Sequence, residues 1–150
     1  MKSPLSIAAV VAALTMALPA AAQFAKPEDA IKYRQSGMSL MAAHFGRLGA
    51  MANGKVPFDA NAAAENAEVV AFVSKLPFSG FVEGSDKGNT KAKPEIWSEP
   101  DKFRAGARNM QEEAVKLSLV AKGGNLDLIK AAFGETAKTC KGCHDTYRAQ

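Results

Sequence analysis

Apolar residues recur along the first part of the sequence at the spacing of an α-helix. Residues 26–29 (Lys-Pro-Glu-Asp) can begin this helix, because proline is tolerated in a first turn and acidic side chains favour the positive end of the helix dipole. Asn53 and Gly54 can end it. The apolar positions follow at steps of seven, three, four and three residues, at Ile31, Met38, Met41, Phe45 and Leu48. One face of the predicted helix is therefore apolar, as in a helix that packs against a core.

A second helix is predicted from Ala60 to about Lys75, with Asp59 as its N-cap and Pro77 as its end. We expect its inner stripe to consist of Val69, Phe72, Val73 and Leu76. Residues 77–97 then carry glycine, proline and charged residues without periodicity. A connection of this length is unusual in a small domain, so it needs a specific reason.

Two more helices complete the pattern. Residues 98–101 (Ser-Glu-Pro-Asp) predict the cap and first turn of a third helix, which Gly123 and Gly124 end. Asn125 can cap a fourth helix from Leu126 to about Arg148. No run of alternating polar and apolar residues reaches five positions, so no strand is predicted. The expected fold class is all-α, an antiparallel four-helix bundle that forms one domain over residues 23–150.

The first 22 residues have the pattern of a cleaved signal peptide. Met1-Lys2 is a short positive start, the stretch from Leu5 to Leu18 is apolar, and residues 20–22 are the small residues that signal peptidase accepts. The apolar stretch is short for a membrane span, which needs roughly 20 residues. We therefore expect cleavage before Gln23 and a soluble periplasmic protein without stable membrane insertion.

The composition fits one ordinary globular domain and argues against a nucleic-acid partner. The chain has 150 residues, of which 47% are hydrophobic and 23% charged. The 19 Lys and Arg exceed the 15 Asp and Glu by four, and this surplus is scattered along the sequence. Nucleic-acid binders gather such charge in a basic stripe, which is absent from the sequence.

The two cysteines of the chain lie in one short motif, residues 140–144 (Cys-Lys-Gly-Cys-His). A Cys-x-x-Cys-His sequence is the attachment motif of c-type haem, because two thiols at this spacing can reach the two vinyl groups of a porphyrin and the next imidazole can meet the iron. A redox disulfide would be expected at the start of a helix that follows a strand. A zinc site would need four ligands, and the only other histidine is His44. The sequence therefore predicts one haem c, covalently attached through Cys140 and Cys143.

A Cys-x-x-Cys-His motif near the C-terminus of a helical chain resembles the class II cytochromes, and specifically cytochrome c′. The resemblance covers essentially the whole mature chain. Its short matches are Lys26-Pro27-Glu28-Asp29, Tyr33-Arg34-Gln35, Pro57-Phe58-Asp59, Lys93-Pro94-Glu95-Ile96-Trp97 and residues 140–148. These flanking matches make the resemblance specific, since the haem motif alone is common to many cytochromes.

The resemblance implies how the haem would be held. His144 would be the proximal iron ligand, with Cys140 and Cys143 as the thioether anchors. Arg148 resembles a basic residue that borders the proximal side of the haem in some family members.

The resemblance also implies contacts from the other side of the bundle. Arg34 and Gln35 resemble a pair that meets the haem propionates, and a cation with several donors suits a carboxylate. The positions that match apolar residues around the distal pocket are Phe78, Phe81 and Phe103.

Met38 leaves two interpretations open. In six-coordinate, low-spin class II cytochromes a methionine at this position is the second axial ligand. In cytochrome c′ the position holds a bulky apolar residue that only crowds a five-coordinate iron. The flanking matches favour the five-coordinate subfamily, by resemblance rather than by spacing.

Each interpretation implies a function. A walled, open sixth position would admit NO and CO, so the protein is expected to bind these gases and to exchange single electrons with an unidentified redox partner. A His/Met iron would make it a pure electron carrier. An enzyme such as a peroxidase is not expected, because no polar acid–base pair maps to the distal pocket.

A homodimer is expected chiefly from the resemblance, because family members commonly pair through their first two helices. Small and apolar residues off the haem-facing stripe give partial support, since small residues let helices approach closely. On the first helix they are Leu40, Ala42, Ala43 and Met51, and on the second Ala62, Ala63, Ala64, Ala67 and Ala71.

Overall fold

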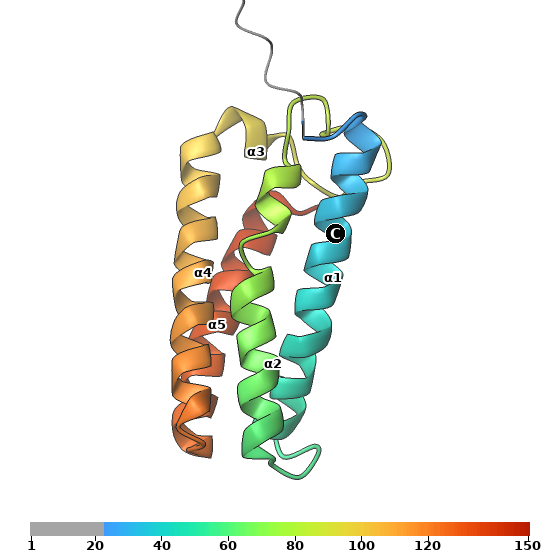
Figure 1. Ribbon diagram of the computed structural model, residues 1–150. Coiled ribbons are helices and arrows are strands. Elements are labelled where there is room, and N and C mark those ends of the chain that lie inside the picture. Colours follow the sequence, from blue (N-terminus) through green and yellow to red (C-terminus); the bar gives the residue numbers. More distant parts are fainter. Residues whose placement is uncertain (1–22) are drawn as a thin grey trace, which may run out of the picture.

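Four long helices and two short ones make up the described chain in the computed structural model (Figure 1). The structure describes residues 23–150, so the predicted signal peptide, residues 1–22, lies outside the described residues. The helices are α1 (Pro27–Ala52), α2 (Ala60–Val73), the 3-10 helix η1 (Pro77–Gly80), α3 (Glu95–Ser98), α4 (Pro100–Lys122) and α5 (Leu126–Tyr147).

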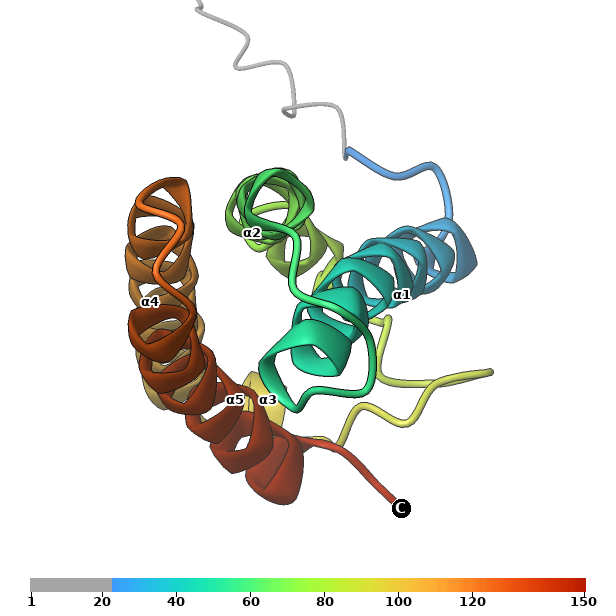
Figure 2. The ribbon, with the colours of Figure 1, turned by 90° about the horizontal axis from the view of Figure 1, so that it is seen from below.

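The long helices form the antiparallel four-helix bundle that the sequence predicts. The chain runs down α1, up α2, down α4 and up α5 (Figure 1), and the view along the bundle shows these helices around one core (Figure 2). Over residues 23–150 there is no strand, only one isolated bridge between Ala92 and Arg148. In the same residues no helix has both the length and the apolar character that crossing a membrane requires.

Two of the predicted helix caps are confirmed and one is wrong. The Asp59 side chain accepts a hydrogen bond of 3.0 Å from the backbone N–H of Ala62. Asn125 caps α5 by accepting bonds of 3.0 and 3.1 Å from the two amides that follow its first helical residue. Ser98 does not cap α4, because it is the last residue of α3 and its hydroxyl donates back to Glu95 O at 3.5 Å.

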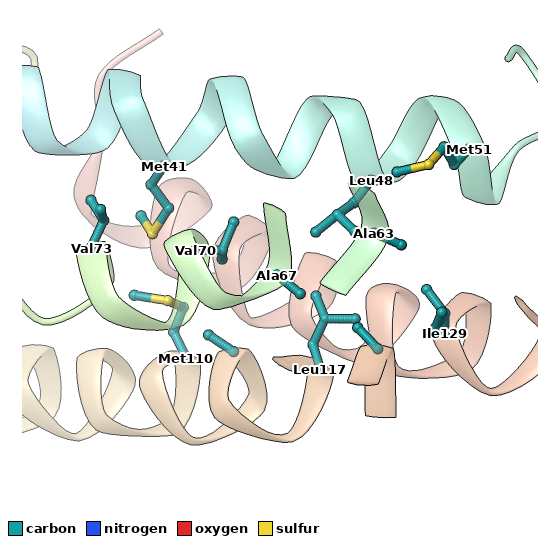
Figure 3. Close-up of a cluster of buried hydrophobic side chains, with 12 residues drawn as sticks. Met41, Leu48, Met51, Ala63, Ala67, Val70, Val73, Met110, Leu117 and Ile129 are labelled. Atoms are coloured by element: carbon teal, nitrogen blue, oxygen red, sulfur yellow. The ribbon is translucent and has the colours of Figure 1, made fainter. Parts of the chain in front are cut away.

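The core lies between α1, α2, α4 and α5 and is built mostly from aliphatic side chains, methionine and alanine. Figure 3 shows Met41 of α1 and Met110 of α4 pointing into the space between their helices. Leu48 and Leu117 are almost completely buried further along the bundle. Small alanines on α2 let its backbone approach α4 closely, which keeps this half of the bundle tightly packed.

Two predictions about α1 and α2 need correction: the small-residue surface for a second copy and the inner stripe of α2. Ala63 and Ala67 are fully buried in the core of their own chain, as is nearly all of Met51, so these three residues cannot form a surface for a second copy. Phe72, expected on the inner stripe, leaves 67% of its surface exposed, and Leu76 leaves 38% exposed. The stripe that actually faces the core runs through Ala63, Ala67, Val70 and Val73. The helical period alone did not distinguish between the two faces, because both carry apolar residues.

The long connection between α2 and α4 is an ordered segment that crosses the bundle from α1 to the end of α5. We call residues 77–94 the strap. Its first part, η1, lies so close to α1 that a Cβ atom on Gly80 would stand 2.7 Å from Ala30 O. Its last part pairs with the chain after α5, through Lys93 N–H to Tyr147 O at 2.9 Å and Ala149 N–H to Lys91 O at 2.8 Å.

Candidate haem site

A cavity of about 480 Å³ lies between α1, α4, α5 and the strap. Its wall is mainly apolar, and its volume is within the range of small-molecule and cofactor sites in proteins. All the site residues predicted from the sequence reach this one wall: Arg34, Gln35, Met38, Phe78, Phe81, Phe103, Cys140, Cys143, His144 and Arg148. The fold thus brings together residues from both ends of the chain, although the role of each residue stays a prediction.

The last turns of α5 present both thiols and the imidazole to the cavity. Cys140 and His144 are one helical turn apart and therefore share a face. Both cysteines are free and half-buried. Burial raises the pKa of both thiols, and the neighbouring Cys140 raises that of Cys143 further.

The surroundings of His144 favour its neutral form. Burial lowers the pKa of His144, and the positive charge of Arg148 lowers it further, against an opposite effect of Asp145. A neutral imidazole has a free nitrogen lone pair, which is the form that can bind a metal. Arg148 lies one turn beyond His144, and its backbone N–H donates to His144 O at 3.1 Å.

The α1 wall of the cavity places Met38 next to the polar Ser39 and close to the apolar Met41 and Phe45. The half-buried Met38 side chain packs against the main core together with Phe45. Met41 of α1 and Met110 of α4 line the same cavity. Unbranched methionine side chains move between rotamers at low cost, so this wall can adapt to what it contacts.

Phe78, Phe81 and Phe103 form one aromatic cluster at the strap end of the cavity. Phe81 and Phe103 meet edge to face with ring centroids 4.8 Å apart, and Phe78 lies 5.7 Å from Phe103. The cluster continues to Tyr147, whose ring stands 5.2 Å from that of Phe103. The aromatic wall therefore reaches α5 three residues after His144.

Arg34 and Gln35 line the cavity but donate their hydrogen bonds to the strap. Only 3% of the Arg34 surface is exposed, and both of its Nη atoms donate hydrogen bonds to oxygens of the strap. The Gln35 amide donates to Asn89 O at 2.8 Å. Burial lowers the pKa of the Arg34 guanidinium, which nevertheless stays protonated because its ordinary pKa is so high. A contact of this pair with haem propionates therefore stays a prediction.

Several polar residues of the cavity wall were not found by sequence reasoning. Thr90 and Lys91 come from the strap, and Thr136 from α5. The strap has no periodicity, so nothing local in the sequence indicates which of its side chains face inward. Tyr147 could have been found, because it follows His144 by three residues and so lies on nearly the same helix face.

A metal site built from protein side chains alone finds no support within residues 23–150. No group of three or more His, Cys, Asp or Glu side chains gathers in that part of the chain. His44, the other histidine, lies between α1 and α2, where its Nδ1 is 2.8 Å from Asn66 Oδ1. The thiols and the imidazole of α5 are therefore the chemically distinctive groups of the site.

These residues fit a covalently attached haem. The cavity is largely apolar, two thiols and an imidazole face it from adjacent turns of α5, and cationic side chains stand at its edge. The fold and the site together define a class of protein, a c-type haem protein built on a four-helix bundle.

The chain belongs to the cytochrome c′ family, whose family profile, described as Cytochrome C′, matches residues 29–148. It is 52% identical over 127 residues to cytochrome c′ of Rubrivivax gelatinosus, covering 84% of this chain and 98% of the relative. The superposition on the crystal structure of that cytochrome includes 85% of this chain and 100% of the chain in the crystal structure, with a TM-score of 0.82. The cofactor is accordingly one covalent haem c, and Cys140 and Cys143 are the only cysteines of the sequence.

Two further solved structures are close relatives. Cytochrome c prime from Shewanella frigidimarina has a TM-score of 0.83 at 45% identity, covering 85% of this chain and 99% of its own. A nitric oxide complex of a variant of cytochrome c prime from Alcaligenes xylosoxidans has a TM-score of 0.80 at 46% identity, covering 85% of this chain and 99% of its own.

Proposed function

We propose that the protein is a periplasmic haem protein that binds NO and CO and takes part in one-electron transfer. One observation carries the proposal: His144 faces the cavity from α5, while α1 presents the apolar side chain of Met38 to the same cavity. Bound haem supplies an iron that can exchange one electron and can hold a small diatomic gas.

The side chains of the cavity select what can enter. His144, in its neutral form, would hold the iron from α5, and the two thiols would fix the porphyrin edge. Met38 and the aromatic cluster would leave room only for small neutral molecules beside the iron. Met38 and the three phenylalanines of the aromatic cluster offer no hydrogen-bond donor to bound O₂, which would distinguish this protein from an oxygen carrier.

The relatives support the gas-binding part of the proposal. A solved relative at 46% identity is a nitric oxide complex of a cytochrome c prime variant. That finding concerns the relative, and it is extended to this chain because the fold matches along most of the sequence and the haem motif is present here.

A second function rests on the same residue. Met38 reaches the same cavity as His144, so its sulfur could become a second axial ligand. The protein would then be a six-coordinate, low-spin electron carrier that does not bind gases.

The absorption spectrum of the reduced, purified protein with and without CO separates the two functions. A gas-binding protein has a high-spin reduced spectrum that changes on addition of CO. A sharply split, low-spin spectrum that is indifferent to CO would leave the electron carrier as the function and would remove the gas-binding proposal.

We propose periplasmic localisation from residues 1–22, which carry the predicted export signal. The mass of the chain purified from cells tests this, since a cleaved protein begins at Gln23. A chain that retains residues 1–22 would contradict it. We expect the protein to act as a carrier or scavenger rather than as an enzyme.

A homodimer is proposed through the exposed face of α1 and α2. On α1, 48% of the Leu40 surface is exposed, and Ala42 and Ala43 beside it are also exposed. On α2, Ala62, Ala64 and Ala71 are half-buried, and Phe72 is exposed. Small residues next to large exposed apolar side chains suit close packing of helices from two copies.

A further inference from the structure

Two side chains of α1 fasten the strap, Arg34 with four hydrogen bonds and Gln35 with one, to Asn89 O. The guanidinium Nη1 donates to Gly80 O at 2.8 Å and to Ser85 Oγ at 2.7 Å. Nη2 donates to Ser85 O at 2.7 Å and to Thr90 Oγ1 at 2.8 Å. An arginine Nη atom carries two hydrogens, so all four Nη hydrogens of Arg34 are used on the strap.

All of these acceptors are uncharged. The acceptors of the guanidinium are two carbonyls and two hydroxyls, and no ion pair forms between Arg34 and a carboxylate of residues 23–150. A buried cation is costly unless its donors are satisfied, so these four bonds are required for Arg34 to stay inside. A lysine has the same charge but not the planar fork that fits four acceptors at once.

The same guanidinium also orders the aromatic wall of the cavity. Its central carbon lies 4.5 Å from the ring centroid of Phe81 and 5.7 Å from that of Trp97. Phe81 in turn packs edge to face on Phe103, and Phe103 on Tyr147 of α5. The position of Arg34 is thereby linked through three rings to the helix that carries His144.

We propose that Arg34 is a positioning residue for the cavity. Its guanidinium holds the strap against α1 and so holds Phe81 in the cavity wall. The ends of the strap have other attachments, at the close contact of Gly80 with Ala30 and at the backbone pairing of Lys91 and Lys93 with the residues after His144.

Loss of the fork would leave residues 81–90 with only two hydrogen bonds from the helix side chains of residues 23–150, which join Gln35 to Asn89 O and Trp97 to Val82 O. It would therefore loosen this segment and open the wall. The effect on gas entry rests on the proposed function, whereas the effect on the strap does not.

The test compares Arg34→Gln and Arg34→Lys in the haem-loaded protein, by hydrogen–deuterium exchange of residues 81–90 and by the rate of CO association. Hydrogen bonds to a charged group contribute about 1.5–3 kcal/mol each, so the strap should lose about tenfold or more in protection in both variants. CO association should become several-fold faster in both. Lys32→Gln, an exposed change on the same helix, is the matched control and should leave both measurements unchanged.

Variants on the strap side keep the proposal testable if Arg34 variants do not fold. Thr90→Val removes one of the two acceptors of Arg34 Nη2, together with the acceptor of the Ala92 N–H. Thr90→Ser keeps the hydroxyl and should restore both protection and rate. If Arg34 served only as a charge toward the haem propionates, Arg34→Lys would match the parent protein and Thr90→Val would be silent. That pattern would overturn the proposal.

The two measurements also separate this proposal from the proposed function. Increased exchange in residues 81–90 without any CO binding, in the parent or the variants, would support the strap contact and contradict gas binding. Unchanged exchange in Arg34→Gln would overturn the positioning role whatever CO does.

Discussion

At the residue scale, Met38 decides which function the cavity supports. Its side chain reaches the cavity from α1, and His144 reaches it from α5. A thioether that only packs beside the iron leaves room for a gas when it swings aside, and methionine does this at low cost because it is unbranched. A thioether that binds the iron would occupy the sixth coordination position and exclude the gas. Substitutions that change sulfur and volume separately distinguish the two cases.

Met38→Ala should accelerate CO association about tenfold or more, because the shortened side chain no longer obstructs the gas. A factor of ten in rate corresponds to about 1.4 kcal/mol of steric barrier. Stopped-flow mixing of the reduced protein with CO measures this. Met38→Leu is the control, since it keeps the volume but has no sulfur, and it should leave the resting spectrum high spin. A change from low to high spin in Met38→Leu would mean that the sulfur is a ligand.

The two thiols should make haem attachment independent of the fold. Because both thioethers are covalent, haem should stay with the denatured chain on acid–acetone extraction. A Cys140→Ala, Cys143→Ala double variant should release its haem in the same extraction, whereas His144→Ala should keep it and change only the ligation. Free haem from the unaltered protein would contradict the attachment.

The cofactor was predictable because its signal is local, whereas the hydrogen-bond partners of Arg34 were not, because they are distant in the sequence. Residues 140–144 carry the haem motif within five consecutive positions, so the cofactor could be predicted from the sequence. The partners of Arg34 lie 46 to 56 residues away in a segment without periodicity. Only the folded chain shows that both Nη atoms of Arg34 bond to the strap.

At the element scale, the four long helices follow from their start and stop signals. Asp59 and Asn125 cap α2 and α5 as predicted, because a capping bond is made within three residues of the cap. The short elements η1 and α3 were not predicted, since each is four residues long and depends on contacts with α1 and α4. Tertiary packing rather than propensity determines such short turns.

The close approach of η1 to α1 can be tested with one methyl group. Gly80→Ala should destabilise the protein by about 1–3 kcal/mol, because the new Cβ would stand 2.7 Å from Ala30 O and 3.0 Å from Arg34 Cβ. Chemical denaturation measures the change.

Gly46→Ala is the matched control for this substitution. It lies inside α1 and its Cβ would meet no atom within 4 Å, so it should stabilise the protein by up to about 1 kcal/mol. Equal stability of Gly80→Ala and the parent protein would show that η1 is not held against α1.

At the scale of the whole molecule, the bundle leaves its α1–α2 face apolar and partly exposed. Ala63, Ala67 and Met51 belong to the internal core, so a dimer contact would depend on Leu40 and the alanines beside it. The same bundle places the cavity between α1 and α5, with α4 and the strap completing its wall. The proposed dimer surface and the cavity adjoin on α1, because Ala42 also lines the cavity.

Leu40→Glu should convert the proposed dimer into a monomer, because a carboxylate would be buried without a partner in the interface. Light scattering at micromolar concentration measures the mass. Leu119→Glu on α4 is the control, since 65% of Leu119 is exposed outside the proposed interface, and it should remain dimeric. A parent protein that is monomeric in this measurement would contradict the dimer.

The spin state of the oxidised protein tests the central claim most directly. Electron paramagnetic resonance of the ferric protein at neutral pH reports whether the iron has one protein side chain as axial ligand or two. We predict a high-spin signal, as expected for His144 as the one axial ligand with Met38 packed beside the open position. A purely low-spin signal would contradict the account and would make the protein a six-coordinate electron carrier.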